Sequence, residues 1–338
     1  MRKFFLILCL IILTFSACQK NIGEEITYNA AYVINGEDHS ISVINLETNE
    51  VTNTFILRNF DYPHHIYLSP DKFRLAISAP SLDLSGGHVH SATPDGKAKL
   101  VTLNALNLEK LECDKNKQAS HNLIFSPDGS ELWTAYMGTA TVQIYDAEKM
   151  KEKTTVTVGT MPLEVTFSAN GQYAFVCNSG DNTVTVIDVA TKAVAATIAV
   201  GNTPVGAWMG SNNKMYVDNE ESNSISVINV ATLTVEETIT LGYKPAMVAY
   251  NGTANELYIT DPDAGKLHYY TFTTQWTLAG SISTGANAHA VAISDDKTKA
   301  YVTNQNANTV TVIDLTSKTV ITNIAVGKKP NGIVLRFL

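Results

Sequence analysis

Short runs in which polar and apolar residues alternate recur along the whole chain. Residues 183–188 and 309–314 both read Thr-Val-Thr-Val-Ile-Asp, and residues 40–45 and 224–229 both read Ser-Ile-Ser-Val-Ile-Asn. A period of two with Val, Ile and Thr dominant is typical of β-strands, and Gly, Asn, Asp and Pro separate the runs. No segment has a sustained helical period, so the pattern predicts an all-β protein.

The runs belong to a longer repeat. A second strand-like phrase, Tyr-Val-Thr-Asn at 301–304, precedes the alternating run, and its copies are anchored at residues 32, 75, 133, 175, 216, 258 and 301. Neighbouring anchors lie about 42 residues apart, except for one spacing that contains an insertion over Ser78–Lys99. Four short strands fit in such a unit, which is typical of a β-propeller blade and not of a helical solenoid. We therefore expect one seven-bladed β-propeller over residues 28–338.

The two ends of the repeat predict how the ring closes. The first copy begins at the second strand of its unit, with Tyr32, whereas the last run, Ile333–Phe337, resembles an innermost strand with no successor. The C-terminal strand should therefore pair into the N-terminal blade, which removes an open sheet edge. Deleting the last eight residues is then expected to open the ring.

The phrase at residues 301–304 resembles the hallmark of the YVTN family of β-propeller repeats. The resemblance covers about residues 28–338 and implies a propeller with surface-layer-like repeats. It implies little about function, because propellers serve as enzymes, receptors and scaffolds alike.

The N-terminal segment has the features of a secretory signal. Arg2 and Lys3 precede an apolar run, Phe4–Leu13, and the small residues Ser16 and Ala17 precede Cys18. The run is too short to span a bilayer, and the residues before Cys18 resemble a bacterial lipobox. We expect a signal peptide over residues 1–17, a tether over 18–27, lipidation of Cys18, and attachment to the bacterial outer membrane, on its periplasmic or surface face, by lipid alone.

Composition narrows the possible partners. The net charge of −8 provides no basic face for nucleic acid, so no nucleic-acid partner is expected. After cleavage and lipidation, Cys113 and Cys177 would remain, and we interpret both as small buried hydrophobic residues. Envelope proteins are the expected macromolecular partners.

Histidines gather at one predicted place in the repeat. The connections into innermost strands and the loops after second strands should lie on one face, because successive strands run in opposite directions. Side chains that can bind a metal ion occur in these connections and loops of several blades. The candidate metal ligands are His64, His65, His121, His289, His88, His90 and Glu164. Imidazoles that converge with a carboxylate suit Zn(II) or Cu(II), so copper or zinc is the expected cofactor.

Neighbouring polar and aromatic residues could hold a small ligand beside the metal. The candidates are Asn122, Asn331, Tyr62 and Tyr136. His39 and His268 are predicted to lie elsewhere. Asn178, Asp218, Asp261 and Asn304, which follow second strands, are predicted to form turns, and the glycines that end outer strands are assigned to backbone requirements.

The pair His64-His65, together with His121 and His289, is similar to the copper-holding propeller of nitrous oxide reductase. That resemblance implies a metal site, whereas the second copper domain of that family has no counterpart here. No Gly-x-Ser-x-Gly, phosphate loop or His-Glu-x-x-His is present. The favoured hypothesis is a non-catalytic envelope lipoprotein that binds a transition metal or small ligand in the funnel of that face. The alternatives are a metal-free interaction scaffold or receptor, and a copper-dependent redox accessory or enzyme.

Overall fold

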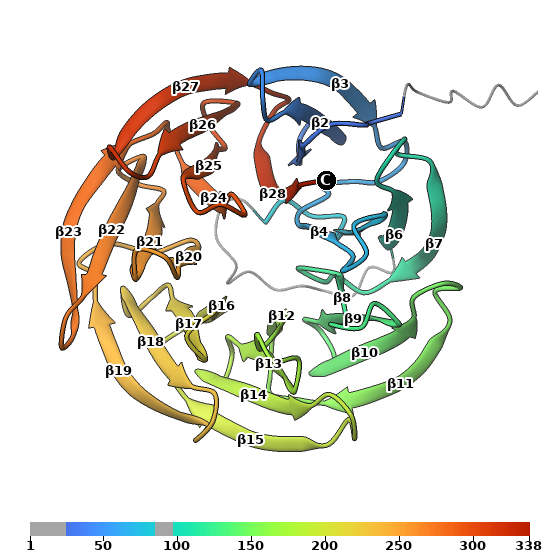
Figure 1. Ribbon diagram of the computed structural model, residues 1–338. Coiled ribbons are helices and arrows are strands. Elements are labelled where there is room, and N and C mark those ends of the chain that lie inside the picture. The colour runs from blue at the N-terminus through green and yellow to red at the C-terminus, as the bar shows by residue number, and fades with distance from the viewer. Residues whose placement is uncertain (1–24, 85–96) are drawn as a thin grey trace, which may run out of the picture.

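The computed structural model describes residues 25–84 and 97–338. These residues form seven four-stranded antiparallel sheets. Figure 1 shows the sheets arranged as blades around a central axis, which is where propellers have their channel. The predicted seven-bladed all-β propeller is therefore confirmed. In the described residues there is no helix long and apolar enough to cross a membrane.

Each blade runs from an innermost strand, a, to an outermost strand, d. Blade 1 has the order β28 (Pro330–Arg336), β1 (Ala30–Asn35), β2 (Ser40–Asn45), β3 (Glu50–Ile56), and blade 2 has β4 (Ile66–Leu68), β5 (Arg74–Ala79), β6 (Ala98–Asn104), β7 (Lys110–Lys117). Blade 3 has β8 (Ile124–Phe125), β9 (Glu131–Tyr136), β10 (Thr141–Asp146), β11 (Glu152–Thr157), and blade 4 has β12 (Pro162–Phe167), β13 (Tyr173–Asn178), β14 (Thr183–Asp188), β15 (Val194–Ala199). Blade 5 has β16 (Pro204–Gly210), β17 (Lys214–Asn219), β18 (Ser224–Asn229), β19 (Thr234–Thr240). Blade 6 has β20 (Val248–Asn251), β21 (Glu256–Asp261), β22 (Lys266–Phe272), β23 (Trp276–Ser283), and blade 7 has β24 (Ala288–Ile293), β25 (Lys299–Asn304), β26 (Thr309–Asp314), β27 (Thr319–Ala325).

The ring closes as the ends of the repeat predicted. Strand β28 pairs antiparallel with β1, with Ala30 opposite Arg336 and Val33 opposite Ile333. Both ends of the propeller therefore meet in blade 1 (Figure 1). Within residues 25–84 and 97–338, every innermost strand is paired, because the C-terminus supplies the one that blade 1 lacks.

The hydrophobic core lies between the blades. In β14 the four central residues are all buried, the threonine as well as the valines, because both faces of a blade are covered by its neighbours. Phe175 and Val186 of blade 4 pack with Ala207 and Met215 of blade 5. The outermost strands are mostly exposed, as in β3.

The asparagine that ends strand b has a different role from the predicted one. Asn304 is buried, and its Nδ2 donates to the hydroxyls of Thr309 and Thr311 in the next strand, at 3.0 and 2.8 Å. Asn35, Asn178 and Asn219 do the same in their blades. The prediction that Asn178 and Asn304 form turns was incomplete. Asn178 does begin a turn, because its carbonyl accepts from the amide of Asp181 at 3.2 Å, but the side chains of both residues also lock strand b to strand c.

The glycine that follows strand d leaves room for the side chain of this asparagine. A Cβ on Gly285 would lie 2.8 Å from Cγ of Asn304, which is closer than real side chains approach. Gly285 has no positive φ. The requirement is therefore one of space beside the buried amide and not of backbone conformation.

The predicted common face is also confirmed. The b–c turns donate to the preceding d–a connections, for example from the amide of Gln305 to the carbonyl of Asn287 at 2.9 Å and from Gly36 to Lys329 at 2.8 Å. We call the face that carries these segments the top face.

Candidate functional site

The pair His64-His65 stands directly before β4, at the top face. The backbone of His64 is held from both sides, because its amide donates to the carbonyl of Ser78 at 3.0 Å and its carbonyl accepts from Gly332 of blade 1 at 3.0 Å. A Cβ on Gly332 would lie 3.0 Å from that carbonyl and from Cα of His65. Glycine at this position lets the two blades approach closely enough to fix the pair.

His121 stands at the equivalent place in blade 3. The hydroxyl of Ser78 in blade 2 donates to the carbonyl of Ser120 at 2.7 Å. On the other side, the side-chain amide of Asn122 reaches blade 4. Its Nδ2 donates to the carbonyl of Val165 at 2.8 Å, and its Oδ1 accepts from the backbone N–H of Val165 at 3.2 Å. Asn122 therefore positions the segment that carries His121.

Three of these imidazoles converge. Nε2 of His64 lies 3.1 Å from Nε2 of His121. One nitrogen from each of His64, His65 and His121 can be chosen so that all three lie within 4.8 Å of one another. The side chains are buried, with residue exposures of 1, 6 and 1%. Predicted site residues from two blades thus form one compact cluster, which we call the histidine cluster.

Glu164, on β12 of blade 4, lies behind His121. Its Oε2 is 3.7 Å from Nδ1 of His121, and Oε1 accepts a hydrogen bond from the hydroxyl of Tyr67 and one from Asn122 at 3.4 Å. Burial raises the pKa of Glu164 to about 8, and the hydrogen bond from Tyr67 opposes that rise. Tyr67, Glu164, His121 and His64 thus form a continuous polar chain across three blades.

His289, on β24 of blade 7, flanks the histidine cluster. Its ring centroid lies 5.8 Å from that of His64 and 6.2 Å from that of His65. Nδ1 is 3.4 Å from the carbonyl oxygen of Asn331, which also accepts from the hydroxyl of Thr303. A carbonyl oxygen can only accept, so this contact favours the neutral tautomer with the proton on Nδ1.

A comparison with protein families matches this architecture. A family model described as "Lactonase, 7-bladed beta-propeller" matches residues 26–205, which is more than half of the chain. The chain belongs to this lactonase family. A search of curated proteins found no match.

Solved structures support the fold of this lactonase propeller. A functionally unknown protein from Desulfotomaculum acetoxidans has a TM-score of 0.75 at 15% identity, covering 91% of this chain and 99% of that one. The periplasmic gluconolactonase of Pseudomonas aeruginosa has a TM-score of 0.72 at 16% identity, covering 91% and 98%. Hydrazine synthase from Kuenenia stuttgartiensis has a TM-score of 0.69 at 17% identity, covering 80% and 88%. At these identities the likeness shows the fold alone.

Membership of the lactonase family corrects the functional hypothesis drawn from sequence. A non-catalytic metal- or ligand-binding lipoprotein is contradicted, because the family is one of lactonases, which are hydrolytic enzymes. The scaffold and copper-redox alternatives fit no better. The family match supports the seven-bladed propeller, but it is not a match to the YVTN family or to nitrous oxide reductase.

The remaining predicted residues are placed as follows in the lactonase propeller. Asn331 is buried, and its side chain is engaged by Gln305, whose Nε2 donates at 2.6 Å, so it holds the segment beside His289. Tyr62 is half-buried against His39, and the hydroxyl of Tyr136 bonds that of Tyr145 within its own blade. Cys18, His88 and His90 lie outside the described residues.

Two further interpretations are settled by the structure. His39 was predicted to lie elsewhere but stands in the β1–β2 turn on the top face, with Nδ1 3.9 Å from Asp61. His268 is in β22, bonded to Asp261 at 3.1 Å and stacked on Tyr243, away from the histidine cluster. Cys113 and Cys177 are free, Cys177 buried and Cys113 partly so.

Tyr67 and Asp218 were not among the predicted site residues. Tyr67 follows His65 by two positions in the inner strand, and period-two alternation places both side chains on one face, so the spacing could have revealed it. Asp218 takes the strand-b position that Ser78, Thr260 and Thr303 occupy in other blades. It is buried, and its Oδ1 accepts from Nε1 of Trp208 at 2.6 Å, so it is not a turn former.

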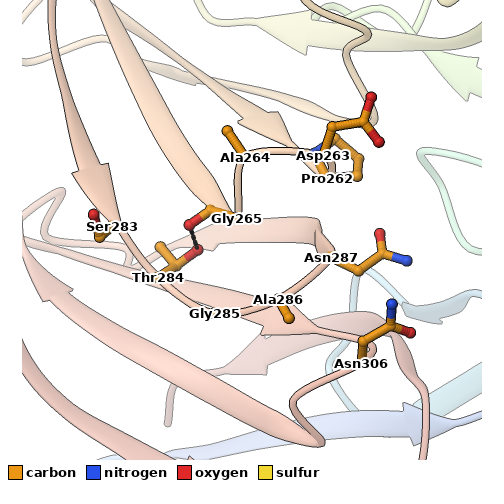
Figure 2. A pocket seen from close by; sticks show the side chains of 10 residues that line it. All are labelled: Pro262, Asp263, Ala264, Gly265, Ser283, Thr284, Gly285, Ala286, Asn287 and Asn306. Atoms are coloured by element: carbon orange, nitrogen blue, oxygen red, sulfur yellow. Dashed lines mark hydrogen bonds between the residues drawn. The ribbon is translucent and has the colours of Figure 1, made fainter.

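A separate depression of about 570 Å³ lies on the top face between blades 6 and 7, as Figure 2 shows. It is lined by the β21–β22 turn, the β23–β24 connection and Asn306, and Thr284 closes one side by donating to the carbonyl of Gly265 at 3.1 Å. Its lining is polar, and Asp263 is the charged residue in it. Asn287 at its edge is two residues from His289, so the depression borders the segment that carries this histidine.

Proposed function

We propose that this protein hydrolyses a lactone at the top-face end of its channel, beside the histidine cluster and His289. One observation carries the proposal: four buried histidines from three blades converge beside a buried glutamate in a member of the lactonase family. Such a gathering of titratable groups at one end of a propeller is a default place for chemistry.

The reaction requires a proton acceptor and a group that polarises the carbonyl. The oxygen of a water molecule bonds to the lactone carbonyl carbon while the water proton passes to an imidazole. The ring C–O bond then breaks, and the leaving alkoxide oxygen takes that proton back. The product is the open-chain hydroxy acid, so all atoms of lactone and water are accounted for.

His289 fits the role of proton acceptor. The carbonyl of Asn331 at 3.4 Å favours the proton on Nδ1 and leaves Nε2 as the basic nitrogen. His289 is 7% exposed, similar to His65 at 6% and more than His64 and His121 at 1%. The histidine cluster, 5.8 Å away between ring centroids, then faces the carbonyl oxygen of the substrate.

The charges around the inner strands favour a lactone without a phosphate group. Lys329 and Lys244, which directly precede the prolines of two inner segments, are paired with Asp83 at 2.6 Å and with Glu220 at 2.9 Å. A phosphate would have to compete with these carboxylates. The structurally similar gluconolactonase of Pseudomonas aeruginosa is consistent with a sugar lactone of this kind.

The test is ring opening of a panel of lactones, with and without phosphate, by the purified protein in the presence and absence of chelator. We expect turnover of at least one uncharged lactone and a loss of kcat of about 10²–10⁴-fold in His289→Gln. His39→Gln is the matched control, because His39 is on the same face but 36% exposed and outside the cluster. Equal rates in His289→Gln and wild type would contradict the assignment.

The predicted lipid anchor would place this activity in the cell envelope. Cys18 follows Ser16 and Ala17 in a lipobox-like context, and this proposal rests on sequence alone. Radiolabelled palmitate should enter the wild-type protein in a bacterial host, and the label should be lost in Cys18→Ser. Labelling that persists in this variant would contradict an anchor at Cys18.

A further inference from the structure

We propose that His64, His65 and His121 hold one divalent transition-metal ion, of the zinc, cobalt or copper type. A catalytic role of this ion rests on the proposed lactone hydrolysis. Binding of the ion is inferred from the geometry of the residues and can be measured without any substrate.

The spacing of the nitrogens suits a metal ion. Ligands at the usual Zn–N distance of 2.0–2.1 Å from a tetrahedral ion lie about 3.3–3.4 Å from one another. Nε2 of His64 and Nε2 of His121 are 3.1 Å apart, and the nitrogens of all three residues fall within 4.8 Å. Small side-chain adjustments would therefore complete three tetrahedral positions.

A hydrogen bond between neutral rings accounts for the contact between His64 and His121, but it does not involve His65. His64 and His121 could share a proton, since either Nε2 can donate. His65 nevertheless packs its ring at centroid distances of 4.7 and 4.6 Å from those of His64 and His121. Three buried imidazoles with one nitrogen each inside a 4.8 Å group are an arrangement that a divalent transition-metal ion binds.

The surroundings resemble the outer shell of a histidine metal site. Oε2 of Glu164 lies 3.7 Å from Nδ1 of His121, which is the nitrogen that would remain after Nε2 binds the ion. A carboxyl group in this place orients the ring that binds the ion. The backbone of His64 is fixed by Ser78 and Gly332, so the ligands are carried by rigid segments.

Among the described residues, three supply ligands in this proposal, whereas a tetrahedral ion has four positions. Open three-histidine sites are typical of catalytic metals, which polarise carbonyl oxygens as Lewis acids. His289 does not belong to the three-residue group, and its ring centroid is 5.8 Å from that of His64. In this proposal His289 is therefore not a ligand, and its role is the proton transfer proposed above.

The test begins with protein stripped by chelator and titrated with Co(II) and, separately, with Zn(II). We expect one equivalent per chain by calorimetry, and visible Co(II) absorption of the intensity typical of four-coordinate sites. His121→Gln and His64→Gln should each weaken binding by 100-fold or more. His268→Gln, a histidine that is bonded to Asp261 outside the cluster, is the control and should bind as wild type does.

Circular dichroism and the melting temperature of each metal-free variant establish that its fold is intact. Binding that is absent from wild type, or unchanged in a folded His64→Gln/His65→Gln/His121→Gln variant, would overturn the metal site. Failure of the lactone assay with metal binding retained would contradict the proposed function alone, so the two proposals fail separately.

Discussion

Nε2 of His64 and Nε2 of His121 lie 3.1 Å apart, although 57 positions separate the two residues in sequence. The cause is the repeat. Each residue stands just before the innermost strand of its blade, and blades 2 and 3 are neighbours in the ring. Equivalent positions of successive blades therefore converge on the channel. Single residues at the same position of several repeats can thus together form one site.

Glu164→Gln tests whether Glu164 is a positioning residue. The amide can still accept from Tyr67, but unlike the carboxyl group it cannot ionise when a cation binds beside His121. We expect metal affinity to fall about 10–100-fold while the stoichiometry stays at one per chain. Calorimetry with Zn(II) measures this, with Glu47→Gln, at an exposed position, as control. An unchanged affinity would show that Glu164 has no influence on the ligand.

Asn304→Ala tests the lock between strands b and c. The substitution removes two hydrogen bonds from a buried amide and leaves a cavity, so the free energy of unfolding should fall by about 2–3 kcal/mol. Urea denaturation gives this value. Asn306→Ala, at an exposed position of the following turn, should change it by less than about 0.5 kcal/mol. Equal effects at the two positions would contradict a structural role specific to Asn304.

Removal of residues 331–338 tests ring closure. These residues form most of β28, whose pairing with β1 joins blade 1 into one sheet. The truncated chain is expected to lose its cooperative thermal transition, because β1 gains an open edge and the channel loses one inner strand. Circular dichroism follows the transition. A truncated protein that melts as sharply as wild type would show that β28 is dispensable.

Asp218→Asn tests how a buried carboxyl group changes the free energy of unfolding with pH. Burial raises the pKa of Asp218 well above 3.8, the carboxylates of Glu220 and Glu164 raise it further, and the hydrogen bond from Trp208 opposes this. The folded state thus holds a proton that the unfolded chain releases above pH 3.8, so stability is greatest below that pH and falls as pH rises through the folded pKa.

We therefore expect Asp218→Asn to lose less stability than wild type between pH 4 and pH 8, by at least about 1.4 kcal/mol, the equivalent of one pKa unit. Urea denaturation at both pH values measures the difference. Equal losses in the two proteins would show that Asp218 ionises normally in the folded state.

Much of the fold could be predicted because each blade repeats the same strand pattern. Period-two alternation marks the strands, the anchors count the blades, and the unmatched strand at Ile333–Phe337 predicts the closure that β28 makes. The topology also placed His64, His65, His121 and His289 at the start of inner segments on one face.

The rest depended on side-chain contacts that a pattern does not encode. The sequence around Asn304 is typical of a turn, and only the structure shows its amide between two threonine hydroxyls. Likewise, the contact that makes Tyr67 part of the site is its hydrogen bond to Glu164 of another blade. The function was inferred wrongly because no local motif marks the site. Its residues come from several blades, and one propeller fold serves many activities.

The most direct test of the central claim locates the bound ligand by NMR. A lactam that matches the best lactone substrate, with a ring N–H in place of the ring oxygen, resists hydrolysis and can be titrated into protein labelled at its histidine rings. The account predicts that the ring signals of His64, His65, His121 and His289 shift in parallel and saturate together, while those of His39 and His268 stay unchanged. Saturable binding that leaves the signals of these four histidines in place would contradict a lactone site at the histidine end of the channel.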